Sequence, residues 1–172
     1  DFHASGLPDA KELALLEPFR AQLPAEVFAA PFSPPVSDGS GQDRVLLRKA
    51  NHLLNEAGCM IREGKRMTPR GEPMQVEFLI DEPTFKPHHM PYIKNLATLG
   101  IDANLRIVDP TQYQARVNDF DFDITVKRFS MSSTPGEEMR SFFSSQSASL
   151  KGSNNLSGIA DPVLDRLIDM IV

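Results

Sequence analysis

The sequence contains no tryptophan and only one cysteine, Cys59, among its 172 residues. A single cysteine excludes an internal disulfide and argues against a cysteine-based metal site. No segment reaches the about 18 consecutive apolar residues that a transmembrane helix needs. The first three residues, Asp-Phe-His, lack the basic and then apolar pattern of a secretory signal peptide. We therefore expect neither a disulfide framework nor a membrane span.

Motifs of common enzyme classes are also missing. The sequence has no GxSxG, no GxxxxGK[ST] and no GxGxxG pattern. Cys59 has no sequence neighbour that would activate its thiol, so we interpret it as structural. His88 and His89 are adjacent and would point to different faces of a helix, and His52 with Glu56 supplies only two metal ligands. We predict no enzymatic activity, no cofactor and no metal site.

Composition allows one domain-sized core. Hydrophobic residues make up 41% of the chain, and the net charge is −5. This modest negative net charge argues weakly against a nucleic-acid partner. Separately, we expect a monomer. The helical pattern of residues 162–172 has no stop signal. We interpret the chain as a piece of a longer protein.

Two regions differ in composition. Residues 1–42 contain one short helical pattern, roughly Pro8 to Gln22, which Pro18 should bend or end. A Pro- and Gly-rich arm without periodicity follows it. Residues 43–172 carry regular α and β patterns. We predict that the helix and arm of residues 1–42 pack on an α/β lobe formed by residues 43–172.

Alternation and helical spacing predict the elements of that lobe. The predicted strands are Met74–Ile80, Ile101–Val108 and Asp121–Arg128. The predicted helices are Arg44–Ala57, Thr84–Leu99 and Pro110–Val117, and Cys59–Pro73 is predicted as a hairpin that turns at Glu63-Gly64. The order indicates an α/β fold with a mixed sheet and βαβ units flanked by helices. The predicted buried faces include the pairs Leu46/Leu53, Val76/Phe78, Leu105/Ile107 and Phe122/Ile124.

The loop after the third predicted strand is the candidate binding site. Ligand sites in α/β proteins favour the carboxyl ends of strands. Arg128, with Lys127, could pair with a ligand carboxylate, and Phe129 and Met131 could form an adaptable apolar wall. Ser130, Ser132, Ser133 and Thr134 could bond a peptide backbone. The alternative interpretation is an ordinary polar surface loop.

Short sequence motifs along most of the chain resemble those of a known family. They are Ser5–Pro8, Glu12–Phe19, Leu53–Gly58, Gly71–Pro73, Asn95–Asp102, Val108–Tyr113, Asn118–Asp123, Ser133–Glu137 and Ser157–Pro162. In this order they resemble the C-terminal lobe of family 5 extracellular solute-binding proteins, peptide-binding components of ABC importers, and most of all the YejA-like branch. That branch usually carries tryptophan near the place where this chain has Phe129.

The resemblance implies one lobe of a periplasmic-binding-protein type II clamshell. It implies a periplasmic protein, with a signal peptide expected in the missing N-terminal part. Such a protein captures a peptide or peptide-like solute and delivers it to a membrane permease. Asn154 and Asn155 resemble a second family loop near the cleft and could bond peptide groups. The alternative function is a ligand-sensing domain of a receptor or regulator with the same fold. The ligand could be a peptide, a modified peptide, an opine or a metal chelate.

Overall fold

The computed structural model describes residues 5–130 and 134–172, and the chain divides into two compact units. Unit 1 combines residues 1–34 with residues 129–172, and unit 2 comprises residues 35–128. This division differs from the boundary after residue 42 that composition indicated. Composition shows where the chain becomes regular, but a compact unit is defined by which segments contact one another.

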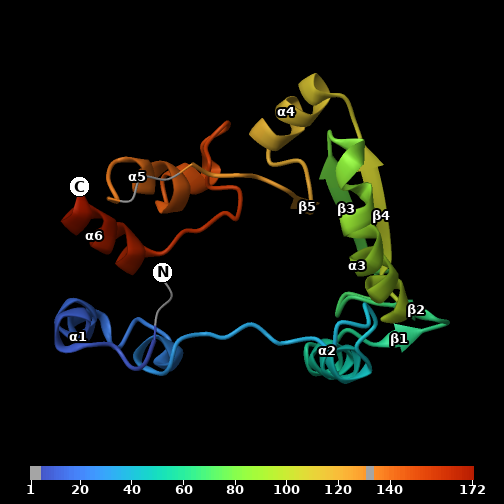
Figure 1. Cartoon of the computed structure of the whole chain (residues 1–172), viewed down its shortest axis with the longest axis horizontal. Helices are drawn as coiled ribbons and strands as arrows, with labels where there is room; N and C mark the ends of the chain where they lie inside the picture. The colour runs from blue at the N-terminus through green and yellow to red at the C-terminus, as the bar shows by residue number, and fades with distance from the viewer. Residues whose placement is uncertain (1–4, 131–133) are drawn as a thin grey trace. The chain divides into compact units, whose positions relative to one another are not determined.

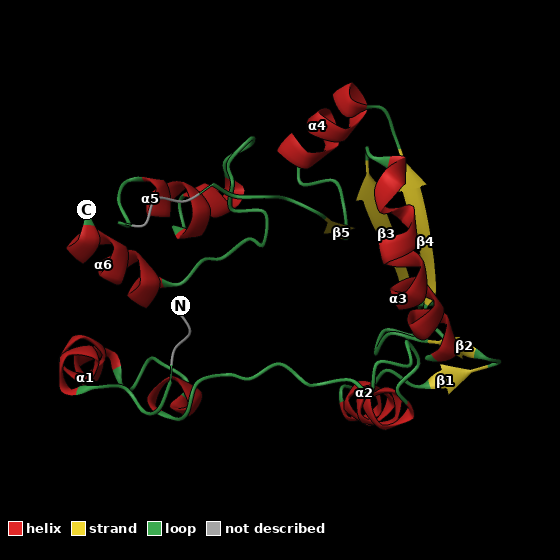
Figure 2. Ribbon diagram, in the orientation of Figure 1, coloured by secondary structure: helices red, strands yellow, loops and turns green. Residues whose placement is uncertain are grey.

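Unit 2 is built on a parallel sheet of three strands. The strands are β3 (Gln75–Ile80), β4 (Asp102–Ile107) and β5 (Ile124–Thr125), in the spatial order β4-β3-β5 (Figure 1). Gln75 lies opposite Asp102, and Phe78 lies between Leu105 and Ile124. Helix α3 (Lys86–Thr98) connects β3 to β4, and helix α4 (Pro110–Asn118) connects β4 to β5 (Figure 2). These crossovers confirm the predicted α/β class with βαβ units.

The remaining elements of unit 2 precede the sheet. Helix α2 spans Arg44–Glu56 and is followed by Gly58 at φ 78°, a left-handed conformation that suits glycine. Strands β1 (Ile61–Arg62) and β2 (Lys65–Arg66) form the predicted hairpin. Both central turn residues, Glu63 and Gly64, have positive φ, as the type I′ turn of a two-residue hairpin loop requires. This antiparallel pair forms a sheet of its own, separate from the parallel strands.

The core of unit 2 lies between helix α3 and the sheet. It contains Phe78, Ile93, Leu96, Leu99 and Ile101, with Leu47, Ala50 and Leu54 of α2 packed against them. Two predicted core residues are exposed instead: Leu53 to 54% and Ile107 to 40%. Leu53 lies off the buried face of α2, and Ile107 is the last residue of an outer strand.

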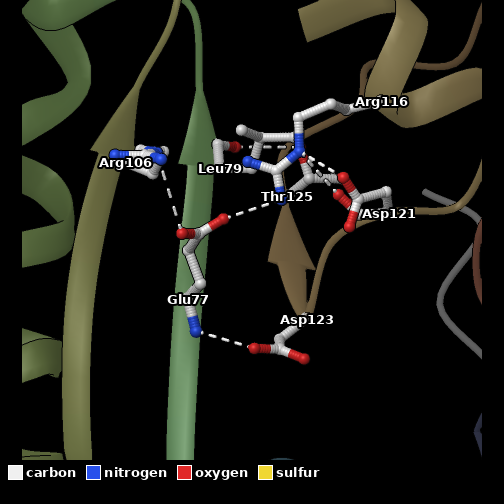
Figure 3. Close-up of polar contacts among 7 residues, drawn as sticks. All are labelled: Glu77, Leu79, Arg106, Arg116, Asp121, Asp123 and Thr125. Carbon is white, nitrogen blue, oxygen red and sulfur yellow. Dashed lines mark hydrogen bonds and ion pairs between the residues drawn. The ribbon is translucent and has the colours of Figure 1, made fainter.

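The third predicted strand is much shorter than expected. Only Ile124 and Thr125 pair with β3, and Phe120 has a φ of 56° in the turn that follows α4. The Asp123 carboxylate accepts the backbone N–H of Glu77 at 2.8 Å, where a longer strand would have placed a backbone carbonyl (Figure 3). The predicted strand Asp121–Arg128 is therefore confirmed only at Ile124 and Thr125.

An ion-pair network holds this turn against the sheet. Arg116 of α4 contacts Glu77 of β3 at 2.8 Å and Asp121 at 2.7 Å (Figure 3). Hydrogen bonds to Asp121 and Glu77 raise the pKa of the Arg116 guanidinium further above its ordinary value. Arg116 is only 21% exposed, so the network is partly shielded from solvent. It fastens the end of α4 and the entry to β5 onto the central strand.

Unit 1 is mainly helical. It contains α1 (Ala10–Leu16), α5 (Glu138–Phe143) and α6 (Pro162–Ile171), and the 3-10 turns η1 (Glu17–Phe19), η2 (Ala25–Phe28) and η4 (Ser147–Ser149). The predicted helix over residues 8–22 ends its regular part before Pro18, as expected. Asp161 caps α6 by accepting the backbone N–H groups of Val163 and Leu164. Across residues 5–130 and 134–172, no helix is both long enough and apolar enough to traverse a bilayer.

Candidate functional site

A small pocket lies at the carboxyl ends of β3 and β5 in unit 2. Its volume is about 230 Å³, and its lining residues are Ile80, Asp81, Glu82, Phe85, Tyr113, Val126 and Arg128. Parallel strands end at one edge of their sheet, so residues that follow β3 and β5 meet there although they are distant in sequence. The pocket occupies the position at which α/β proteins most often bind ligands.

Hydroxyl groups fix one wall of this pocket. The Tyr113 hydroxyl of α4 lies 2.9 Å from Thr125 Oγ1 and 2.8 Å from the carbonyl oxygen of Val126. Thr125 Oγ1 also donates to the carbonyl of Leu79 at 3.0 Å (Figure 3). Asp109 caps the start of α4 through the N–H groups of Thr111 and Gln112. The hydroxyl of Tyr113 is thus held by Thr125 of β5 and by the next residue, Val126, and Tyr113 is itself a lining residue of the pocket.

The charged side chains of the pocket differ from the Tyr113 hydroxyl in their hydrogen bonding. No hydrogen bond or ion pair links the side chains of Asp81, Glu82 or Arg128 to another residue within the described part of the chain. Asp81 is half-buried, and Glu82 and Arg128 are exposed. Two carboxylates and one guanidinium therefore remain available to a ligand in a pocket that Ile80, Phe85 and Val126 also line.

The residues of the predicted loop fall in both units. Arg128 lines the pocket of unit 2. Phe129 belongs to unit 1, is 44% exposed and packs edge-on against Phe142 of α5 with ring centres 5.0 Å apart. Ser130 and Thr134 are exposed. Met131, Ser132 and Ser133 lie outside the described residues, so their predicted roles stay predictions.

The two asparagines of the second predicted loop differ in exposure and in hydrogen bonding. Asn154 is half-buried, and its amide donates to Ser141 Oγ at 3.2 Å. Asn155 is only 1% exposed, and its side chain bonds the N–H and the carbonyl of Ile159 at 2.9 and 2.8 Å. It also donates to the carbonyl of Ser144. Direct ligand contact by Asn155 does not fit this geometry, because burial and internal hydrogen bonds occupy its amide.

Both predicted loops meet helix α5 in unit 1. Phe129 contacts Phe142, and Asn154 contacts the preceding residue, Ser141. Beside them is a hollow of about 350 Å³, lined by Arg140, Ser141, Ser144, Gln146, Ser147, Leu150, Lys151, Gly152 and Ser153. The Arg140 guanidinium is already paired with Asp169 at 2.7 Å. The other polar lining residues of this hollow are four serines, a glutamine and a lysine.

Of the seven lining residues of the pocket in unit 2, only Arg128 was predicted from the sequence as a site residue, and the other six were missed. Asp81 and Glu82 directly follow β3, and the rule applied to the third strand would have selected them as well. Phe85 and Tyr113 carried no such signal, because their contribution depends on how η3 (Pro83–Phe85) and α4 pack at the sheet edge. Within the described ranges, no group of three or more His, Cys, Asp or Glu residues is arranged to hold a metal ion.

Comparisons with known proteins agree with this architecture. Residues 19–150 match the profile of "Bacterial extracellular solute-binding proteins, family 5 Middle". The probable peptide-binding protein YejA of Agrobacterium fabrum is 40% identical over 171 residues, which cover 98% of this chain and 28% of that protein. The uncharacterized protein YejA of Escherichia coli is 34% identical over 173 residues, covering 100% of this chain and 28% of that protein. The chain thus spans little more than a quarter of the length of these relatives.

Solved structures share the fold. A periplasmic oligopeptide-binding protein from Thermotoga maritima superposes with a TM-score of 0.62 at 20% identity, over 72% of this chain and 25% of that chain. The oligopeptide-binding protein AppA of Bacillus subtilis, solved with a nonapeptide, gives a TM-score of 0.60 at 21% identity, over 72% and 25% of the two chains. At these identities the likeness establishes the fold.

Proposed function

The chain belongs to the family 5 bacterial extracellular solute-binding proteins, and from this premise we propose that the whole protein captures an extended, peptide-like solute for an ABC importer. The observation that carries the proposal is the pocket at the carboxyl edge of β3 and β5. Its Asp81, Glu82 and Arg128 side chains make no internal hydrogen bond or ion pair among the described residues. A peptide offers partners for both signs of charge, because it carries an ammonium group, a carboxylate and backbone amides.

The size of the pocket indicates how such a solute is held. At about 230 Å³ it is smaller than the roughly 300–1,000 Å³ of sites that enclose a whole small ligand. It therefore accommodates one part of an extended solute. We propose that Arg128 contacts this part of the solute. Further solute contacts are proposed for Phe129, Ser130, Met131, Ser132, Ser133, Thr134 and Asn154. Asn155 is assigned to holding its loop in shape.

The proposed mechanism is capture by closure of two lobes. This chain would form most of one lobe, and the other lobe would cover the solute by a hinge motion. Binding changes no covalent bond, so we propose a binding protein without enzymatic activity, acting in the periplasm with a membrane permease as its partner. This assignment agrees with the Agrobacterium relative, which is described as a probable peptide-binding protein.

The first experiment identifies the solute. Full-length protein is purified from its native host under mild conditions, and a native mass spectrum is recorded. We expect a bound species in the mass range of short peptides. The stripped protein is then heated with a pool of synthetic di- to hexapeptides, where a ligand at about 100 times its Kd adds about 2.7 kcal/mol of stability. No bound species and no thermal shift with any peptide would overturn the proposal.

A variant shows whether the pocket takes part. Replacing Arg128 by Met removes the guanidinium of a lining residue, and we expect weaker peptide binding. Arg62→Met is the matched control, because Arg62 lies on the exposed hairpin strand β1 and its side chain makes no hydrogen bond or ion pair with the described residues. Equal loss of affinity in both variants would assign the effect to net charge.

A further inference from the structure

Positive charge is concentrated in one part of unit 2. Residues 44–70, which include α2 and the hairpin of β1 and β2, contain seven of the 18 lysines and arginines of the chain and only two of its 23 acidic residues. This local excess contrasts with the net charge of −5 of the whole chain. Arg66 is buried, and the other six basic residues are exposed. We call these six the basic surface: Arg44, Arg48, Lys49, Arg62, Lys65 and Arg70.

The two elements that carry the basic surface are neighbours in space. The buried guanidinium of Arg66 in β2 donates to the side chains of Asn51 and Asn55 of α2, and Figure 1 shows the hairpin beside that helix. Arg62 and Lys65 lie directly opposite each other in the hairpin. Because successive side chains of a strand alternate between its faces, Lys65 and its partner Arg62 project on the side away from α2. The positive charge thus extends from α2 across the outer face of the hairpin.

Several of these charges are placed where they oppose local stability. Arg44 is the first residue of α2, at the positive end of the helix dipole, and the first turn contains no acidic residue. Arg44 and Arg48 are four residues apart on the helix, where like charges repel. Arg62 and Lys65 form a cross-strand pair of like charge, which is also destabilising. Stability therefore does not account for these residues, and such departures are typical of functional surfaces.

Acidic side chains do not neutralise the basic surface. None of its six side chains makes a hydrogen bond or an ion pair among the residues that the structure describes. The Asp43 carboxylate attracts Arg48 without forming an ion pair, and Glu56 is paired with His52 at 3.3 Å. By contrast, Arg116 at the far end of the sheet is held by two carboxylates. The charges of the basic surface remain available to an external anion.

Apolar side chains are exposed beside these charges. Met60 is 52% exposed and Ile61 is 50% exposed, and both directly precede Arg62 at the start of the hairpin. Basic residues next to exposed apolar residues are typical of protein surfaces that bind at the interface of a membrane. The hairpin therefore combines electrostatic attraction with apolar side chains that can enter the headgroup region.

We propose that the basic surface binds the anionic headgroups of a phospholipid membrane. The inference goes beyond the proposed function and rests on it only for the location of the protein beside a membrane. Lipid phosphates form an adaptable layer of negative charge, which suits long side chains that no internal partner holds in place. Each lysine or arginine near such a layer raises the affinity about fivefold. Six of them together give a strong and salt-dependent attraction.

The basic surface lies at the opposite end of the sheet from the pocket in unit 2. The N–H of Met74 donates to the carbonyl of Arg66, and the N–H of Arg66 donates to the carbonyl of Gly100, so the hairpin adjoins the starts of β3 and β4. The pocket lies where β3 ends, and the six residues of β3 span about 20 Å. We therefore expect membrane binding to leave the affinity for a peptide unchanged.

The test measures binding of full-length protein to vesicles by flotation. The probes are vesicles of phosphatidylcholine alone and vesicles of phosphatidylcholine and phosphatidylglycerol in equal parts. We expect binding to the anionic vesicles only, and loss of that binding between about 0.1 M and about 1 M NaCl, because the Debye length falls from about 10 Å to about 3 Å. Equal binding to both kinds of vesicle, or binding that salt does not weaken, would contradict the inference.

A triple variant tests the surface itself. Lys49→Gln/Arg62→Gln/Lys65→Gln should bind anionic vesicles about a hundredfold more weakly than wild type. Its urea midpoint should equal or exceed that of wild type, because the repulsion between two opposed cations is removed. The control variant loses the same charge at exposed positions of α1, α3 and α6 and should bind as wild type does: Lys11→Gln/Lys86→Gln/Arg166→Gln.

The remaining outcomes separate this inference from its alternatives. Equal loss of vesicle binding in both triple variants would assign the effect to net charge and overturn the inference, as would a lower urea midpoint of the first variant. If wild type ignores the vesicles but the first variant alone impairs import through the permease, the basic surface docks on an acidic protein and the lipid proposal is wrong. Peptide calorimetry is independent: vesicle binding without peptide binding would reject the proposed function and retain this inference.

Discussion

Phe78 occupies the centre of the unit 2 core. It is 2% exposed, and its ring packs edge-on against Tyr92 with centres 5.8 Å apart. Replacing it by Ala should lower the free energy of unfolding by about 3–5 kcal/mol, because the substitution leaves a cavity between α3 and the sheet. Phe122, which the sequence placed in the core, is only half-buried. Phe122→Ala should cost clearly less.

Urea denaturation of the two variants checks this order. The midpoint should fall further for Phe78→Ala than for Phe122→Ala at an unchanged dependence on urea. A larger loss for Phe122→Ala would show that the residue next to β5 contributes more to the core than its exposure indicates.

Arg66 is the other residue on which unit 2 depends. It is fully buried, with 0% exposure, and its guanidinium donates to the backbone carbonyls of Cys59 and Leu99 and to the side chains of Asn51 and Asn55. These acceptors come from α2, from the turn after it and from the end of α3. A single side chain thereby joins the hairpin to two helices.

Replacing Arg66 by Met should lower the free energy of unfolding by about 3–5 kcal/mol. The substitution keeps a long apolar stem but leaves several buried acceptors without a donor. Arg62→Met is the matched control on the neighbouring strand, and we expect it to change stability by less than about 0.5 kcal/mol. Equal midpoints for the two variants would show that water replaces the guanidinium at little cost.

Among the helices, we expect the stability of the start of α2 to depend on pH. The backbone N–H groups of Leu46, Asp38 and Val45 donate to the Asp43 carboxylate and lower its pKa below the ordinary value of 3.8. A depressed pKa in the folded state means that this contribution is present above the unfolded value. It is then lost as the pH falls through the folded pKa.

Asp43→Asn should therefore make the acid limb of the stability profile shallower. Asparagine still caps the helix, but it does not titrate. Denaturation midpoints measured from about pH 5 downward should converge for the variant and wild type as Asp43 becomes protonated. Asp102→Asn should follow wild type, because the Asp102 side chain makes no hydrogen bond or ion pair with the described residues. Parallel profiles for all three proteins would contradict the assignment.

In the full-length protein, the affinity for a peptide should depend on residues outside this 172-residue chain as well. The pocket encloses only about 230 Å³, whereas a bound small molecule typically has about 70–90% of its surface buried. If the proposed second lobe supplies the missing contacts, the isolated 172-residue chain should bind a peptide at least about a hundredfold more weakly than full-length protein. Circular dichroism must first show that the isolated chain is folded.

Calorimetry of both proteins with the same peptide makes the comparison. Equal affinities would place the complete site within these 172 residues and reject closure of two lobes as the basis of binding. Loss of affinity in the isolated chain, with its helical content intact, would support the proposed closure.

The candidate site shows the limits of prediction from sequence. Arg128 was predicted because a polar loop follows a strand, and the structure places it in a pocket. Asp81 and Glu82 follow another strand, but their meeting with Arg128 depends on β5 pairing beside β3. Asn155 was predicted to contact ligand, because an asparagine side chain has the same sequence signature whether it faces solvent or satisfies a buried loop.

Local signals in the sequence determined the order of the elements in unit 2. Asp43 and Asp109 begin helices, Glu63-Gly64 turns the hairpin, and Gly58 ends α2, because each effect acts within a few residues. The short motifs that resemble the solute-binding family predicted which fold these elements form, and the comparisons confirm that fold.

The tertiary structure alone decided where distant segments meet. It shortened the third strand, since the Asp123 carboxylate takes the N–H of Glu77, and it buried Arg66 among acceptors from three segments. It also divided the chain into two units after residues 34 and 128. These outcomes depend on the free energy of contacts between remote residues, which no local pattern encodes.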